Sequence, residues 1–130
     1  VLLAQRVAPG NQGLALACGA SAIIIHDWTP FLGFKGGKGV ATSAGVFAAL
    51  APSAIAIATA SFALAVWASG HISVGSLTGA AALPLAAALL DRPGAVSAAA
   101  AAAGVLIIYK HVPNIRRLAG GKELGVDGAR

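Results

Sequence analysis

Charged residues are scarce in this sequence, and their scarcity indicates the class of protein. Only 10% of the 130 residues are Asp, Glu, Lys or Arg, whereas 58% are apolar, and the mean hydropathy is +0.83. Residues 39–90 form a stretch of 52 residues without a single charged side chain, which is longer than one bilayer crossing requires. A soluble core does not explain such a stretch. The sequence therefore predicts an integral membrane protein, with residues 1–130 as a single membrane domain.

Cysteine, histidine and aromatic residues are also rare. Cys18 is the only cysteine, which excludes an intramolecular disulfide. The three histidines are scattered along the chain, so no metal-ligand cluster is recognisable. Aromatic residues make up 5% of the chain and are not interleaved with the basic ones, which argues against a nucleic-acid surface. We expect no metal, no cofactor and no nucleic-acid partner, and we attribute the net charge of +5 to membrane orientation.

Apolar runs separated by turn residues predict an all-α protein, a polytopic bundle of about five short transmembrane helices. The runs cover residues 13–25, 40–50, 53–69, 74–90 and 95–109. The two clusters richest in Lys and Arg lie near Lys38 and near Arg116. The positive-inside rule puts both clusters in the cytoplasm. An even number of crossings must then separate them, so Pro52 marks a return between two helices rather than a kink in one. The prediction is two hairpins, 39–69 and 73–110, with three polar connections on the cytoplasmic side.

At both ends of the chain the sequence predicts less regular structure. Residues 1–12 are expected to be a remnant of a preceding helix or loop, and residues 124–130 a flexible tail. The chain opens on Val1 rather than Met, which favours a truncated N-terminus.

Residues 33–42 form the segment with the clearest chemical character. They read Gly-Phe-Lys-Gly-Gly-Lys-Gly-Val-Ala-Thr and set two lysines among four glycines. Glycines let backbone N–H groups approach a ligand, lysines add positive charge, and the apolar run that follows places a helix N-terminus there. The segment is no Walker A motif, because Leu32 replaces the first glycine and Gly39 follows Lys38. It predicts an anion site of another kind, with a tight turn carrying membrane-facing lysines as the alternative.

A second polar segment, residues 110–123, follows the last apolar run. It combines an imidazole, an amide and several cations, which suit a phosphate group. The alternative is a basic juxtamembrane segment that touches anionic headgroups. His111 and Asn114 weigh against that alternative, since neither is needed for charge.

Together these segments resemble the PlsY family, bacterial membrane enzymes that transfer a fatty acyl group from acyl phosphate to glycerol 3-phosphate. The family's second motif, approximately G-H-x-x-x-x-F-x-G-F-K-G-G-K-x-V-A-T, matches in register from His26 to Thr42, with Ile25 in place of the leading glycine. Its third motif, approximately H-R-x-N-I-x-R-L-x-x-G-x-E, matches from His111 to Glu123, with Val112 in place of the arginine. The family's first motif, close to S-G-N-x-G-A-T-N-x-x-R, is missing, so the resemblance indicates an N-terminally truncated member.

The resemblance implies an active site built from these motifs and from a serine-containing connection between them. The residues it implies for catalysis are His111, Asn114 and Lys38. Those implied for binding the substrate phosphates are Gly36, Gly37, Lys38, Gly39, Ser76 and Arg117. Supporting roles are implied for His26, Lys35, Thr42, Ser73 and Glu123. His111 would hydrogen-bond a substrate or accept a proton, and His26 would orient the glycine loop.

The implied function is synthesis of lysophosphatidic acid for phospholipids in the bacterial cytoplasmic (inner) membrane. Its partners would be acyl phosphate, glycerol 3-phosphate and membrane lipids, with the active-site loops facing the cytoplasm. The H-x-x-x-x-D pattern of thioester-using acyltransferases is absent, because the fifth residue after the three histidines is Phe31, Ser76 and Arg116 respectively. The alternative function is a non-enzymatic membrane module that binds or transports a small anion.

Overall fold

The computed structural model describes residues 1–28, 36–90 and 94–126. All regular elements in this part of the chain are helices, as predicted. They are α1 (Leu2–Val7), α2 (Gln12–Asp27), α3 (Val40–Leu50), α4 (Pro52–Ser69), α5 (Ile72–Leu89), α6 (Gly94–Lys110) and α7 (Val112–Ala119). The residues between the predicted runs 74–90 and 95–109 lie largely outside the described part of the chain, as do the motif positions 31–35, which include Lys35.

The return predicted at Pro52 is confirmed. Ala51 leaves the helical conformation with φ −149° and ψ 68°, and Pro52 starts α4 in its first turn. Proline is tolerated there because the first N–H groups of a helix have no intrahelical partner. Pro84, by contrast, lies inside α5, which continues past it to Leu89.

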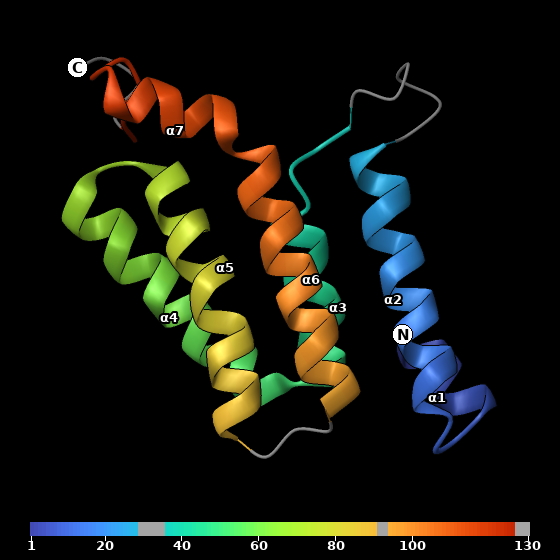
Figure 1. The fold of residues 1–130 in the computed structure, drawn as a ribbon. Coiled ribbons are helices and arrows are strands. Elements are labelled where there is room, and N and C mark those ends of the chain that lie inside the picture. Colours follow the sequence, from blue (N-terminus) through green and yellow to red (C-terminus); the bar gives the residue numbers. More distant parts are fainter. Residues whose placement is uncertain (29–35, 91–93, 127–130) are drawn as a thin grey trace.

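The helices alternate in direction along the chain (Figure 1). At one end of the bundle α2 ends, α3 begins, α4 ends, α5 begins and α6 ends. The three polar connections therefore share one end, as the count of crossings predicts. From that end α7 leaves α6 at an angle of 53° and lies across the top of the bundle.

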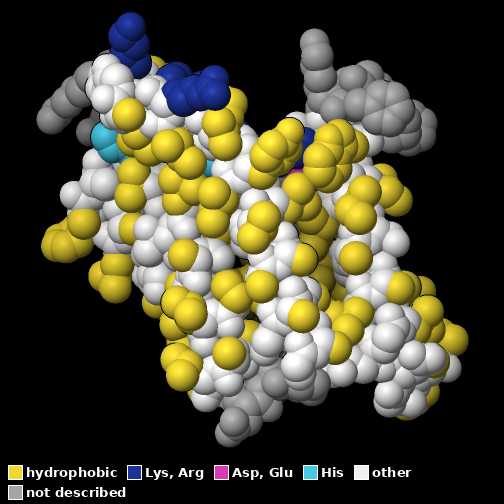
Figure 2. All heavy atoms as spheres, viewed as in Figure 1, with side chains coloured by type: hydrophobic (Ala, Val, Ile, Leu, Met, Phe, Trp, Pro, Cys, Tyr) yellow, Lys and Arg dark blue, Asp and Glu magenta, His cyan; other side chains and the backbone are white. Residues whose placement is uncertain are grey.

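Two of the predicted crossings, α4 and α5, are 18 residues each and apolar enough to span a membrane. The bent pair of α6 and α7 makes a third candidate span, whereas α3 is a shorter apolar helix. Figure 2 shows the Lys and Arg side chains of this face gathered at the end that carries α7, with apolar side chains over the rest. This distribution is the one expected of a protein embedded in lipid.

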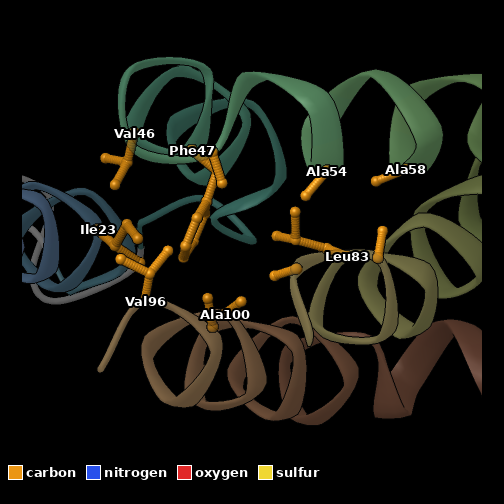
Figure 3. Close-up of a cluster of buried hydrophobic side chains, with 12 residues drawn as sticks. Ile23, Val46, Phe47, Ala54, Ala58, Leu83, Val96 and Ala100 are labelled. Atoms are coloured by element: carbon orange, nitrogen blue, oxygen red, sulfur yellow. The ribbon is translucent and has the colours of Figure 1, made fainter. Parts of the chain in front are cut away.

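The core is built mainly from small residues around a few larger ones. Phe47 of α3 is 1% exposed and lies among Ile23 of α2 and Val96 of α6 (Figure 3). Helices approach closely at Gly104, where an added Cβ would lie 2.7 Å from the carbonyl oxygen of Ala80. Small residues allow such contacts, which hold helices together where lipid removes the hydrophobic drive.

Candidate active site

The glycine loop is held by close packing against the end of α2. A Cβ atom on Gly36 would lie 2.7 Å from the backbone carbonyl of Asp27, and one on Gly37 would overlap the His26 ring. A Cβ on Gly39 would lie 2.9 Å from Oδ2 of Asp27, and Gly39 also has a positive φ of +72°. The amide of Gly37 donates to the carbonyl of His26 at 3.2 Å. These contacts give a packing reason for glycine at all three positions and suit the orienting role expected of His26.

The end of α6 is fastened to the same place. The ammonium of Lys110 donates to the backbone carbonyl of Asp27 at 2.8 Å and lies 4.1 Å from the centroid of the Trp28 ring. Because His111 follows Lys110 directly, this contact fixes the start of the C-terminal segment beside the glycine loop. The sequence did not predict this contact of Lys110, since neither Asp27 nor Trp28 stands at a fixed position of a motif.

A chain of hydrogen bonds joins the two motifs, which are far apart in the sequence. Lys38 Nζ donates to Asn114 Oδ1 at 2.7 Å, and Asn114 Nδ2 donates to Glu123 Oε1 at 2.5 Å. Glu123 Oε2 accepts from Arg117 Nε at 2.6 Å. The hydrogen bonds from Asn114 and Arg117 lower the pKa of Glu123 to about 2, because they stabilise the ionised carboxylate. Glu123 is therefore an anion at neutral pH that orients the Asn114 amide.

The Nδ1 of His111 is committed to a backbone carbonyl, which leaves Nε2 for the cavity that His111 lines. The residue is 2% exposed, and its Nδ1 lies 2.8 Å from the carbonyl oxygen of Ile107. A carbonyl oxygen only accepts, so Nδ1 carries a hydrogen, and in the neutral imidazole Nε2 then keeps its lone pair. This arrangement is the one required of a proton acceptor.

The predicted residues meet at a cavity of about 590 Å³, bounded by α3, α4, α5 and α6. Its volume falls in the usual range for small-molecule sites. Six of the predicted site residues line it: Lys38, Ser73, Ser76, His111, Asn114 and Glu123. The remaining wall is largely apolar and includes Ile55, Phe62 and Leu83. One end of the cavity thus suits an anion and the rest a hydrocarbon chain.

The other predicted residues that the structure describes do not line this cavity. Arg117 acts on it through Glu123, and its own side chain is 46% exposed. Five more of the predicted site residues in the described chain lie off the cavity wall: His26, Gly36, Gly37, Gly39 and Thr42. Sequence reasoning in turn missed Ser43, a cavity residue whose only sequence signal is its place directly after the second motif.

The sequence profile of one protein family, described as Glycerol-3-phosphate acyltransferase, matches residues 1–121. The chain belongs to this family. Two relatives named glycerol-3-phosphate acyltransferase illustrate the match. The protein of Geobacter sulfurreducens is 42% identical over 123 residues, which cover 95% of this chain and 63% of the relative. That of Methylorubrum extorquens is 44% identical over 113 residues, covering 87% and 55% respectively.

Solved structures agree with the family assignment. The crystal structure of PlsY (YgiH), an integral membrane glycerol 3-phosphate acyltransferase, in its glycerol 3-phosphate form matches with a TM-score of 0.89 and 31% identity, covering 95% of this chain and 62% of that one. The lysophosphatidic acid form matches with a TM-score of 0.88 and covers 98% and 66%. The resemblance to the PlsY family is confirmed. The chain spans roughly three fifths of the length of these acyltransferases.

Proposed function

We propose that this chain carries the site of an acyltransferase that moves a fatty acyl group from acyl phosphate to glycerol 3-phosphate and yields lysophosphatidic acid. The observation that carries the proposal is the hydrogen bond from Lys38 to Asn114. It brings the two motifs together at the rim of a cavity with one polar end and a long apolar wall. The names of the related acyltransferases support glycerol 3-phosphate as the acceptor, and the lysophosphatidic acid form of the solved structure supports that product.

The cavity suits a substrate with a charged head and a hydrocarbon tail. Lys38 is the cation on the cavity wall, and its ammonium can bind a phosphate oxygen while it keeps its contact with Asn114. The apolar tail of the acyl phosphate fits along Ile55, Phe62 and Leu83, where burial of its methylene groups is favourable. Ser76 lies near the polar end, and its hydroxyl donates to the carbonyl of Ile72 at 3.0 Å, which leaves its oxygen free to accept.

The proposed chemistry requires no covalent enzyme intermediate, because acyl phosphate is an activated mixed anhydride. A hydroxyl oxygen of glycerol 3-phosphate forms a bond to the acyl carbon, and its proton passes to Nε2 of His111. The bond from that carbon to the phosphate oxygen breaks, and the phosphate leaves with the electron pair. Lys38 stabilises the negative charge, while the cavity holds both substrates in the geometry for attack.

The protein would act in the bacterial cytoplasmic membrane with the active-site end facing the cytoplasm. The supporting observation is the gathering of basic residues at the end formed by α7 and the start of α3. Cysteine-accessibility labelling of single cysteines placed at exposed Lys122 and at exposed Leu89, in a background lacking Cys18, tests this orientation. Lys122→Cys should be protected in intact cells from a membrane-impermeant reagent, and the reverse pattern would contradict the orientation.

The test of function uses the protein as its whole gene encodes it, expressed and assayed in membranes. We expect lysophosphatidic acid to form from glycerol 3-phosphate with acyl phosphate, and not with acyl-CoA or acyl carrier protein as donor. Lys38→Ala should lower kcat/KM by about a hundredfold or more, since a charged contact to the transition state is lost. Lys122→Ala, which removes an exposed cation away from the cavity wall, is the matched control and should leave the rate unchanged. Glycerol 3-phosphate binding without transfer from any donor would favour the anion-binding module instead.

A further inference from the structure

Ser43 on α3 differs from four other helical hydroxyls of the described chain. Each of these donates to the carbonyl four residues earlier: Ser61 (2.9 Å), Ser69 (2.6 Å), Ser76 (3.0 Å) and Thr78 (2.9 Å). The Oγ of Ser43 is buried and has no hydrogen-bond partner among the described residues, and the residue is 2% exposed. A buried hydroxyl without a partner is unfavourable, so such a group is a candidate for pairing with a ligand.

The position of Ser43 indicates which part of a ligand it would meet. Its amide donates to the carbonyl of Gly39 at 2.8 Å, so it lies one helical turn into the bundle from the glycine loop. It lines the main cavity together with its neighbour Ala44 and with Lys38. Ser43 is thus placed between the cation that would hold the phosphate and the apolar wall that would hold the chain. The acyl carbonyl is the group that joins these two parts of an acyl phosphate.

Two other serines on the cavity wall are less available as donors to that carbonyl. The hydrogen of Ser76 is committed to Ile72, and Ser73 lies beside the Glu123 carboxylate, an acceptor at the polar end. The Oγ of Ser43 has no hydrogen-bond partner among the described residues. A serine hydroxyl turns about a single bond, so it can swing toward a ligand without movement of the backbone.

We propose that the Ser43 hydroxyl donates a hydrogen bond to the acyl carbonyl oxygen of the substrate. The inference rests on the proposed function and assigns to Ser43 a catalytic contact within it. When the glycerol oxygen bonds to the acyl carbon, the carbonyl π electrons move onto this oxygen. They return to form the carbonyl again as the bond to phosphate breaks and phosphate leaves with its electron pair. A donor placed at this oxygen stabilises the charge where it develops.

The chain offers a matched control in Ser97 on α6. Its Oγ is likewise buried and without a hydrogen-bond partner in the described chain, but Ser97 lines neither the main cavity nor the smaller cavity bounded by α2, α3 and α6. The two serines therefore share the unfavourable burial of a hydroxyl and differ in access to the cavity. A comparison of their alanine variants separates an effect on chemistry from an effect on folding.

The experiment measures two quantities, kcat for acyl transfer and Tm. Both are measured for Ser43→Ala and for Ser97→Ala, each made in the protein as its whole gene encodes it. Ser43→Ala should lower kcat by about a hundredfold, the usual effect of losing one such donor, with the KM for glycerol 3-phosphate within about twofold. Its Tm should stay the same or rise, because an unpaired buried hydroxyl is removed. Ser97→Ala should show the same Tm response with an unchanged kcat. Ser43→Cys, similar in size but a weak donor, should give an intermediate kcat.

Three other outcomes would each overturn one claim about Ser43 or about the proposed function. A normal kcat for Ser43→Ala in a protein whose wild type is active overturns the role of Ser43 and leaves the proposed function standing. A joint loss of Tm and kcat in Ser43→Ala that Ser43→Cys fully restores shows that Ser43 fills space only. A wild type that transfers no acyl group from acyl phosphate contradicts the proposed function itself.

Discussion

The two halves of the candidate site are held in place by different physical means. The glycine loop is fixed by shape, because Gly36, Gly37 and Gly39 each approach the end of α2 too closely for a Cβ atom. The C-terminal segment is fixed by charge and hydrogen bonds, which run from Asn114 through Glu123 to Arg117. The first half should therefore be sensitive to added volume and the second to lost polar groups.

The largest effect should follow a change of shape in the loop. In Gly36→Ala the new methyl group would meet the backbone of Asp27, which cannot rotate away as a side chain could. Overpacking of this kind costs about 1–3 kcal/mol of stability, and a displacement of the loop by about 1 Å can lower activity by about a hundredfold. Thermal unfolding and acyl-transfer rates measure the two effects. Gly45→Ala on α3, where an added Cβ has nothing within 4 Å, is the control and should be at least as stable as the wild type.

A smaller effect should follow the loss of a polar group in the other half. Asn114→Ala removes the partner of both Lys38 and Glu123, and hydrogen bonds to charged groups are worth about 1.5–3 kcal/mol. Transfer activity should therefore fall by about tenfold to a hundredfold, and Tm should fall as well because Glu123 loses a hydrogen bond. Asn11→Ala is the matched control, since it removes the cap of α2, where Asn11 accepts from the amide of Leu14 at 3.0 Å. The Asn11→Ala variant should lose stability and keep its activity. An Asn11→Ala variant that keeps its stability and loses activity would argue against the proposed difference between the two halves of the site.

The smallest effect concerns the pH dependence of the polar half. The pKa of Glu123 is lowered to about 2 from its ordinary value of 4.5, so the folded protein prefers the ionised form. The stability that Glu123 supplies is then fully present above pH 4.5 and is lost as pH falls toward 2. The Tm difference between wild type and Glu123→Gln should stay constant from pH 8 to pH 5 and shrink below pH 4.5. A difference that already shrinks between pH 8 and pH 6 would show that Glu123 is not held in this network.

The sequence predicts the helices well, because its turn residues act locally. Pro52 separates two helices for a steric reason that any helix obeys, and the distribution of Lys and Arg places three connections at one end. The direction of α7 was not predictable, since it depends on contacts made across the bundle. The boundaries of the helices also differ by one or two residues from the apolar runs, as capping decides the last turn.

The site was predictable where motifs carry it and not where tertiary contacts do. Lys38, His111 and Asn114 were expected together from the family resemblance, and they line one cavity. The packing of Gly39 on the Asp27 carboxylate was not foreseen, because the spacing of glycines does not reveal what fills the space beside them. Ser43 was also missed, since an unpaired hydroxyl becomes visible only when all its neighbours are placed.

The most direct test of the central claim, that the two halves form one site through Lys38 and Asn114, is a double-mutant cycle on acyl-transfer kcat/KM. Residues in direct contact show non-additive effects, whereas independent residues add within about 0.5 kcal/mol. We predict that Lys38→Ala combined with Asn114→Ala is hardly worse than Lys38→Ala alone. A double variant whose loss equals the product of the two single losses would contradict it.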